Sequence, residues 1–194
     1  MNFSVTHMQE VAQIAEKIDI AKIEQMIEIL VGVKQSGGRL FILGVGGSAG
    51  NASHAVNDFR KLAGIEAYAP TDNVSELTAR TNDEGFETIF SGFLSISKLN
   101  SNDCLLILSV GGGDAERGIS KNLCAGIDFA KSKNSKIIGI VGREGGYTHR
   151  YSDVCLVIPP VNPASITPHS EAFQAIVWHL MVSHPKLKAN ATKW

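Results

Sequence analysis

The sequence predicts an α/β protein in which helices cover both faces of a parallel sheet, giving three layers and a doubly wound topology. Short apolar runs of strand length each end in glycine or proline, and helical patterns separate them. A long helical pattern also precedes the first run. We therefore expect one domain over residues 1–194, made of an N-terminal helical region, 1–36, and an α/β core, 37–194.

The N-terminal region is expected to be helical from about Val11 to Val33. Apolar residues there recur at three- and four-residue steps, at Ile14, Ile18, Ile20, Ile23, Ile27, Leu30 and Val31. Two glycines, 37 and 38, end this pattern. The first predicted strand, 39–44, follows, and the next helix is expected from Ser48 to about Leu62.

The remaining elements repeat this alternation. A second strand, 104–110, runs into three glycines and Asp114, and a helical segment then reaches about Lys131. Two more strands are predicted at 136–141 and 154–158, and further helical segments lie between Asp72 and Leu99. A last helix is expected from about Pro168 to Ser183, since proline is tolerated in a first turn.

Composition narrows the classes of function. The 18 Lys and Arg residues against 19 Asp and Glu give a formal charge of −1, so no broad basic surface is available for nucleic acid or an anionic membrane. No export signal and no long apolar run is present, which predicts a cytoplasmic protein outside membranes. Cys104, Cys124 and Cys155 lie in apolar patterns without metal-binding spacing and are expected to be buried, inert thiols.

Two glycine turns are candidate anion sites. They are Gly44-Val-Gly-Gly-Ser48 and Ser109-Val-Gly-Gly-Gly-Asp114, each placed where a strand meets a helix. Backbone N–H groups at such turns can face a phosphate. Neither turn matches a P-loop or a dinucleotide fingerprint, so no nucleotide cofactor is expected. The alternative is structural: the glycines permit tight turns, and Ser48 and Asp114 cap helices.

Several motifs together resemble the phosphoheptose isomerases of the sugar isomerase (SIS) superfamily. They are Gly44-Val-Gly-Gly-Ser48, the His54-x-x-x-Asp58 step, Asn82-Asp-Glu-Gly-Phe86 with Ile89-Phe90, and a closing helix with Glu171 and His179. The resemblance spans nearly the whole chain. It implies a flavodoxin-like SIS fold and interconversion of sedoheptulose 7-phosphate with a heptose 7-phosphate, in the making of lipopolysaccharide, capsule or natural-product heptoses.

The chain departs from the family pattern in the turn that binds phosphate. Where the family has Ser-x-Ser-Gly-Asn-Ser, this sequence has Ser109-Val-Gly-Gly-Gly-Asp114 and keeps one serine. The carboxylates also differ, because the family's catalytic Glu is here Asp58 and its Gln is here Glu171. The family's Asn after the first glycine is Val45, and an Asp before the last helix falls on Pro168. These departures predict a divergent branch with a different or differently modified sugar.

The resemblance assigns roles to particular residues. Asp58 and His179 are the candidate catalytic pair, and His54, Asp58, Glu171 and His179 are the candidate ligands of one zinc ion per site. Substrate and phosphate binding falls on Gly46, Gly47, Ser48, Asn82, Asp83, Ser109, Gly111, Gly112, Gly113 and Asp114. The family further implies a homotetramer with sites between subunits and a sugar phosphate as the small-molecule partner.

The chemistry of these residue types agrees with isomerisation. An aldose–ketose isomerase moves a proton between adjacent carbons through an enediol and needs a general base and an acid. Asp58 is a candidate base and His179 a candidate acid, because imidazole exchanges protons near neutral pH. Glu171 and His179 are eight positions apart, about 12 Å along a helix, and cannot both reach one ion from a straight helix. Either a neighbouring subunit contributes one, or Glu171 precedes the regular helix.

Two other functions use the same residues. The chain can be a non-catalytic SIS module that senses a sugar phosphate or binds a protein, as relatives that serve as a scaffold for the replication initiator do. It can also be a lyase or epimerase that uses the same proton abstraction. Asp58 and His179 favour the enzyme, whereas the loss of serines from the second turn favours the binding module. Trp178, beside His179, is expected to pack between helices or subunits.

Overall fold

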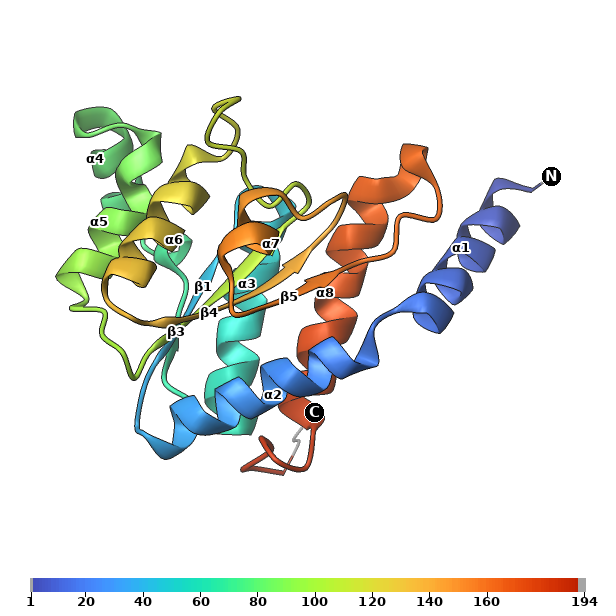
Figure 1. Ribbon diagram of the computed structural model, residues 1–194, viewed down its shortest axis with the longest axis horizontal. Helices are drawn as coiled ribbons and strands as arrows, with labels where there is room; N and C mark the ends of the chain where they lie inside the picture. The colour runs from blue at the N-terminus through green and yellow to red at the C-terminus, as the bar shows by residue number, and fades with distance from the viewer. Residues whose placement is uncertain (1, 192–194) are drawn as a thin grey trace.

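The structure is a computed structural model that describes residues 2–191. Five parallel strands form one sheet in the order β2-β1-β3-β4-β5, with helices on both faces. This order is the flavodoxin-like doubly wound arrangement, so the predicted fold class is confirmed (Figure 1). The strands are β1 (Leu40–Leu43), β2 (Ala67–Tyr68), β3 (Cys104–Ser109), β4 (Lys136–Val141) and β5 (Val154–Val157).

The helices alternate with these strands along the chain. They are α1 (Phe3–Lys17), α2 (Ile20–Gln35), α3 (Gly47–Asp58), α4 (Val74–Asp83), α5 (Ile89–Ile96), α6 (Lys121–Ser132), α7 (Gly146–Tyr151) and α8 (Ile166–Ser183). Three short 3₁₀ turns and a π-helical turn, Phe59–Ala63, complete the described chain. No helix within residues 2–191 is both long and apolar enough to cross a membrane.

The N-terminal region is helical as expected from Val11 to Val33, but it begins earlier, at Phe3, and consists of two helices. The helical path breaks at Ile18 and Asp19, where the Asp19 carboxylate accepts a hydrogen bond from the N–H of Lys22 and caps α2. In Figure 1, α1 projects away from the rest of the molecule, while α2 runs along the sheet. Only two residues of α1 are buried, Glu10 and Ile14.

Two hydrophobic cores lie on opposite faces of the sheet. Side chains alternate between faces along each strand. Leu40 and Ile42 of β1 therefore join the core under α2, α3 and α8, whereas Phe41 and Leu43 join the core under α5 and α6. All six residues of β3 are buried, as expected for the central strand of a covered parallel sheet.

The segment after β3 differs from the prediction. The helix was expected directly after Asp114, but α6 begins at Lys121. The intervening residues form a loop held by two backbone hydrogen bonds between Asp114 and Ile119, and the Asp114 carboxylate accepts the N–H of Arg117. Asp114 therefore caps a turn inside this loop rather than a helix.

Candidate active site

The site is built on α3 and α8, which pack against each other on one face of the sheet (Figure 1). Helix α3 starts at the first glycine turn and carries His54 and Asp58 one turn apart at its C-terminal end. Helix α8 carries His179 near its own C-terminal end. The two helices thus bring together side chains that are more than 120 residues apart in the chain.

The carboxylate of Asp58 lies at the centre of this group. Its Oδ2 is 3.2 Å from Nε2 of His179 and 3.5 Å from Nε2 of His54. The indole Nε1–H of Trp178 donates to the same oxygen at 3.4 Å, and the Asn57 amide donates to Oδ1 at 3.0 Å. Asp58 is almost fully buried, while the two imidazoles are partly exposed, so the group opens to solvent on the imidazole side.

The hydrogen bonds fix which nitrogen of His179 can exchange a proton. Nδ1 lies 2.8 Å from the carbonyl oxygen of Ala175, which can only accept, so Nδ1 carries a hydrogen. The nitrogen facing Asp58 is therefore Nε2. A neutral imidazole would then point its lone pair at a carboxylate, which is favourable only with a proton or a cation between them.

Three of the four expected metal ligands meet at one point. The ligand atoms of His54, Asp58 and His179 lie within 4.8 Å of one another. Two imidazole nitrogens and one carboxylate oxygen are donors that transition metals take, and three protein ligands leave a position open. The residues present therefore fit a metal ion.

Glu171 does not join this group. A Cβ atom added to Gly47 would lie 2.6 Å from the Glu171 carboxylate, so this side chain lies over the first glycine turn. Helix α8 runs unbroken through both Glu171 and His179. Residues eight positions apart on one helix cannot both reach one ion, which agrees with the separation of Glu171 from the group. Two explanations were open for how Glu171 and His179 could share an ion: Glu171 precedes the regular helix, or a neighbouring subunit contributes one of them. Because Glu171 lies within α8, the first is excluded.

The first glycine turn needs its glycines and connects to α8 through polar side chains. Gly46 has φ 63° and ψ −127°, a conformation that side chains other than hydrogen essentially forbid. Ser48 is buried and accepts a hydrogen bond from Gln174 at 3.1 Å. Asn51 donates to Gln174 and to the Glu171 carbonyl, both at 2.9 Å. Ser48 is therefore not the cap of α3, which is Gly46.

The second glycine turn packs backbone against backbone. A Cβ on Gly112 would lie 1.8 Å from the carbonyl oxygen of Gly145, so only glycine fits there. The Ser109 hydroxyl accepts the N–H of Gly112 at 3.0 Å. The carbonyls of Gly112 and Gly113 accept hydrogen bonds from Thr148 and Tyr147 of α7. Much of this turn is thus used to hold the loop before α7, as the structural alternative expected.

Asn82 and Asp83 lie at the end of α4, on the other face of the sheet from α3 and α8 (Figure 1). Both are exposed, and the Asn82 amide donates to Asp83 at 2.7 Å. Within residues 2–191 of one chain, neither Asn82 nor Asp83 forms a hydrogen bond or ion pair with Asp58 or the two imidazoles.

Sequence reasoning missed three partners of the site. Trp178 was expected only to pack, yet it donates to Asp58. Gln174 and Asn51 were not singled out, although each follows an assigned residue, Glu171 or Ser48, by three positions on a helix. That spacing places them on the same helix face and was the available signal.

A second group of possible ligands joins α1 to α8. His7, Glu10 and His169 present ligand atoms within 4.8 Å of one another, and the His169 Nε2 is 2.7 Å from Glu10. Glu10 also accepts the Asn162 amide at 2.6 Å. These two hydrogen bonds, the one with His169 first, lower the pKa of Glu10. The group fastens the start of α8 to the projecting helix.

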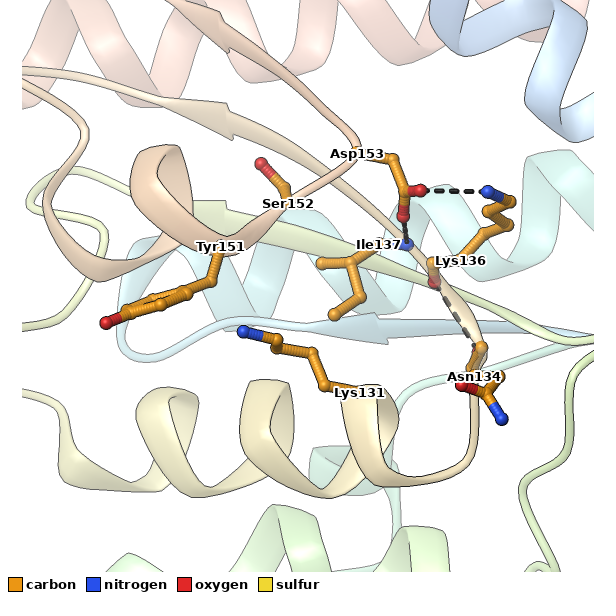
Figure 2. A pocket seen from close by; sticks show the side chains of 8 residues that line it. Lys131, Asn134, Lys136, Ile137, Tyr151, Ser152 and Asp153 are labelled. Atoms are coloured by element: carbon orange, nitrogen blue, oxygen red, sulfur yellow. Dashed lines mark hydrogen bonds and ion pairs between the residues drawn. The ribbon is translucent and has the colours of Figure 1, made fainter.

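A separate cavity of about 380 Å³ lies at the opposite edge of the sheet, near the start of β4 (Figure 2). Its charges are already paired. Lys136 is 2.9 Å from Asp153, which also accepts the N–H of Ile137 at 2.9 Å, and the Lys131 ammonium lies 4.2 Å from the centre of the Tyr151 ring. It lies away from the carboxyl ends of the strands, where ligands of such sheets bind.

Comparison with known proteins agrees with this fold. The SIS domain model matches residues 6–142. The chain is 28% identical to a phosphoheptose isomerase of Syntrophotalea carbinolica over 90% of this chain and 88% of that protein. It is 32% identical to one from Rhodospirillum rubrum over 76% of this chain and 75% of the relative.

A solved structure of a related protein has the same fold. A phosphoheptose isomerase from Neisseria gonorrhoeae superposes with a TM-score of 0.79, at 26% identity, over 92% of this chain and 94% of that one. The chain belongs to the SIS domain family and, among its members, to the phosphoheptose isomerases. The resemblance inferred from the motifs is thus confirmed.

Proposed function

We propose that this protein is an aldose–ketose isomerase that interconverts a ketose phosphate of the sedoheptulose 7-phosphate type with a heptose 7-phosphate. The observation that carries the proposal is the approach of His179 Nε2 to the buried carboxylate of Asp58, 3.2 Å away, beside an opening to solvent. The relatives are named phosphoheptose isomerases, which supplies the substrate class.

The reaction needs one proton to leave carbon and one to reach oxygen. In the aldose-to-ketose direction, a base takes the proton from C2 while an acid protonates the carbonyl oxygen on C1, and the enediol forms. The proton is then returned to C1 as the C2 hydroxyl gives up its own. We assign the base to Asp58 and the acid to His179, whose Nε2 is its exchangeable position because Nδ1 is held by Ala175.

A zinc ion held by the same residues is the alternative to proton donation by His179, because Nε2 cannot bind a metal and donate a proton at once. His54, Asp58 and His179 supply two nitrogens and one oxygen, and Glu171 is not needed for a site with an open position. When bound, zinc would polarise the sugar carbonyl as a Lewis acid. The chain's own contribution is to orient the ligands: Trp178 and Asn57 hold the Asp58 carboxylate, and Ala175 holds the His179 ring.

We further propose a cytoplasmic homotetramer with sites completed between subunits. Exposed apolar side chains flank His179 on α8, at Ile176 and Leu180, and the projecting α1 exposes Phe3, Val5 and Met8. Such clustered apolar exposure is typical of protein interfaces. Asn82 and Asp83, distant from Asp58 within one chain, would reach a site only from another subunit.

The direct test is to incubate the protein with sedoheptulose 7-phosphate, with zinc or with a chelator, and to follow aldose formation by NMR. We expect turnover that falls by about 10²–10⁴-fold in Asp58→Asn and in His179→Gln, because each removes a proton-transfer group. His149→Gln, a change to an exposed histidine of α7, is the matched control and should keep full activity.

The outcomes separate the functions. No turnover by the wild-type protein, or unchanged turnover in both variants, would reject the isomerase. Binding of the sugar phosphate without turnover would instead support the non-catalytic module. Loss of turnover in the chelator, restored by zinc, would support the metal assignment.

A further inference from the structure

The residues His7, Glu10 and His169 form a cluster between α1 and α8 that has no part in the proposed reaction. His7 and Glu10 are three positions apart on α1, which places both on one face of that helix. His169 lies in the first turn of α8, and one ligand atom from each residue lies within 4.8 Å of the other two. His169 and His179 are ten positions apart on α8, about 15 Å along its axis, so this α1–α8 cluster is separate from the catalytic pair.

Both oxygens of the Glu10 carboxylate have defined partners. Oε1 accepts the Asn162 amide at 2.6 Å, and Oε2 lies 2.7 Å from Nε2 of His169. Asn162 is itself held, since its Oδ1 accepts the N–H of Ala164 at 3.0 Å. Asn162 therefore fixes the carboxylate with Oε2 toward His169, in the way that an outer hydrogen bond orients a metal ligand.

His169 is not satisfied by Glu10 alone. This residue is 3% exposed, and its Nδ1 is buried with no hydrogen-bond partner in the described part of the chain. A doubly protonated ring would bury an N–H donor without an acceptor, so an ion pair with Glu10 leaves one polar atom unexplained. An imidazole can bind a metal through either nitrogen.

The charges of the cluster favour a cation. Within residues 2–191, Glu10 forms no ion pair with a lysine or arginine, and its one charged partner is His169. With both imidazoles neutral, the cluster carries one negative charge and offers nitrogen lone pairs. Two imidazoles and a carboxylate are ligands that zinc and similar divalent metals take.

We propose that His7, Glu10 and His169 bind a divalent transition metal of the zinc type, which joins α1 to α8. Only two residues of α1 are buried, and Glu10 is one of them, so an ion at this point strengthens the attachment of the projecting helix. Three protein ligands leave one position for water on the side of His7, which is partly exposed. The inference does not depend on the proposed function.

Binding of the ion requires small movements of the side chains. Two ligands of one zinc lie about 3.4 Å apart when each bond is about 2.1 Å, so Glu10 Oε2 and His169 Nε2 separate from 2.7 Å as the ion replaces the hydrogen between them. The His7 ring stacks on the His169 ring, with centres 4.5 Å apart and 27° between the planes, and must turn its lone pair toward the ion. His7 is partly exposed and forms no hydrogen bond through its ring within residues 2–191, so it is free to turn.

The test removes the ligands around Asp58 so that the second site is measured alone. In the full chain, His54→Gln together with His179→Gln deletes two of the three ligands there. Calorimetric titration of this double variant with zinc should show about one ion per chain. Adding His7→Gln should weaken the binding at least about tenfold, because a ligand is lost. If the double variant binds no zinc, or binds it equally well after His7→Gln, the proposal is wrong.

A matched control addresses binding of zinc to histidines in general. His184 also lies beside a glutamate, with its Nε2 3.8 Å from Glu24, but it belongs to neither group of possible ligands in the described chain. His184→Gln in the double variant should leave zinc binding unchanged. A loss equal to that of His7→Gln would mean that the α1–α8 cluster is not the site. His7 is the preferred variant because its ring forms no hydrogen bond whose loss would unfold the protein.

Hydrogen exchange measures whether the ion joins the two helices. Zinc should slow amide exchange in α1 of the double variant at least about tenfold, since a ligand that binds only the docked helix opposes its opening. After His7→Gln, zinc should have no such effect. Exchange in α1 that is equal with and without zinc would show that the ion does not bridge α1 and α8, and the proposal would fall.

The number of bound ions separates this site from the proposed function. Two ions on the wild-type chain and one on the double variant support both metal sites. One ion on each protein supports the α1–α8 cluster and rejects a metal at Asp58. One ion on the wild type and none on the double variant confines zinc to the candidate active site and rejects the second site.

Discussion

Asp58 depends on neighbours that hold its carboxylate in place beneath two imidazoles. Trp178 is 1% exposed, so its Nε1–H meets the carboxylate and not the substrate. Trp178→Phe keeps an aromatic ring but removes the donor, which is worth about 1 kcal/mol. We expect kcat to fall by about three- to tenfold with KM nearly unchanged, measured by steady-state kinetics. A change in KM alone would contradict a role through Asp58.

A second buried carboxylate, Asp103, stabilises the fold instead of the site. It is 1% exposed and accepts hydrogen bonds from Arg39 and Asn100, the closest at 2.7 Å from the Arg39 guanidinium. Its hydrogen bonds raise the pKa of Arg39. Asp103→Ala leaves Arg39 without its partner and should lower the free energy of unfolding by about 3–5 kcal/mol, measured by chemical denaturation.

The control for Asp103 is an ion pair at the surface. Lys186 and Glu28 pair with both side chains more than half exposed. Lys186→Ala should leave the unfolding midpoint unchanged, because water replaces the lost partner. Equal effects of the two variants would mean that burial does not set the strength of the Arg39–Asp103 pair.

The sequence identified the residues of the site better than their partners. His54, Asp58 and His179 stood out because their types and spacing fit proton transfer and metal binding, and the fold brings them together. Glu171 has the right chemistry, yet its position two turns before His179 on one unbroken helix directs it to the glycine turn. Trp178 could not be recognised, because its partner lies 120 positions away.

At the scale of elements, the first glycine turn controls where α3 begins. Gly46 has room for a Cβ, so any cost of Gly46→Ala comes from its φ of 63° and ψ of −127° alone. We expect that variant to lose about 1–3 kcal/mol of unfolding free energy and to lower activity, as α3 carries Asp58. Denaturation and kinetics on the same preparation measure both effects.

Gly50 provides the matched control on the same helix. It lies inside α3, and a Cβ there would meet nothing within 4 Å. Gly50→Ala should therefore gain about 0.5–1 kcal/mol, since alanine favours a helix and glycine does not. A loss of stability in both variants would point to contacts of the turn beyond its backbone conformation.

Strands and helices were predicted correctly where the spacing of apolar residues kept one period throughout the element. The four strands read as apolar runs were found within a residue or two of their predicted ends. The two-residue β2 was missed because so short an edge strand, Ala67–Tyr68, carries no pattern of its own. The break between α1 and α2 was missed because the helical spacing of apolar residues continues across Asp19. The two helices are separated by a feature that apolar spacing does not show, the hydrogen bond that the Asp19 carboxylate accepts from the N–H of Lys22.

At the scale of the whole molecule, the central strands depend on both cores at once. β3 pairs with β1 and β4 and is covered on both faces, so it opens only when the whole sheet unfolds. β5 lies at the edge of the sheet and is paired on one side. The protein therefore has regions that should open at different free energies.

The three cysteines report on these regions. Cys104 lies in β3, Cys155 in β5 and Cys124 in α6, and all are buried. Burial raises the pKa of each thiol, for Cys155 from an ordinary 9.0 to about 12. Unfolded thiols thus lose protons at lower pH than folded ones, and stability should fall as the pH rises from about 9 towards 12.

Thiol labelling followed by mass spectrometry measures the opening of each region. At pH 8 the native protein should react slowly at all three cysteines, with Cys155 labelled before Cys104, because an edge strand opens locally while the central strand waits for global unfolding. In denaturant the three should react at similar rates. If Cys104 reacts in the native protein as fast as Cys155, then β3 is released together with the edge, and the sheet does not have the stable centre that its two cores imply.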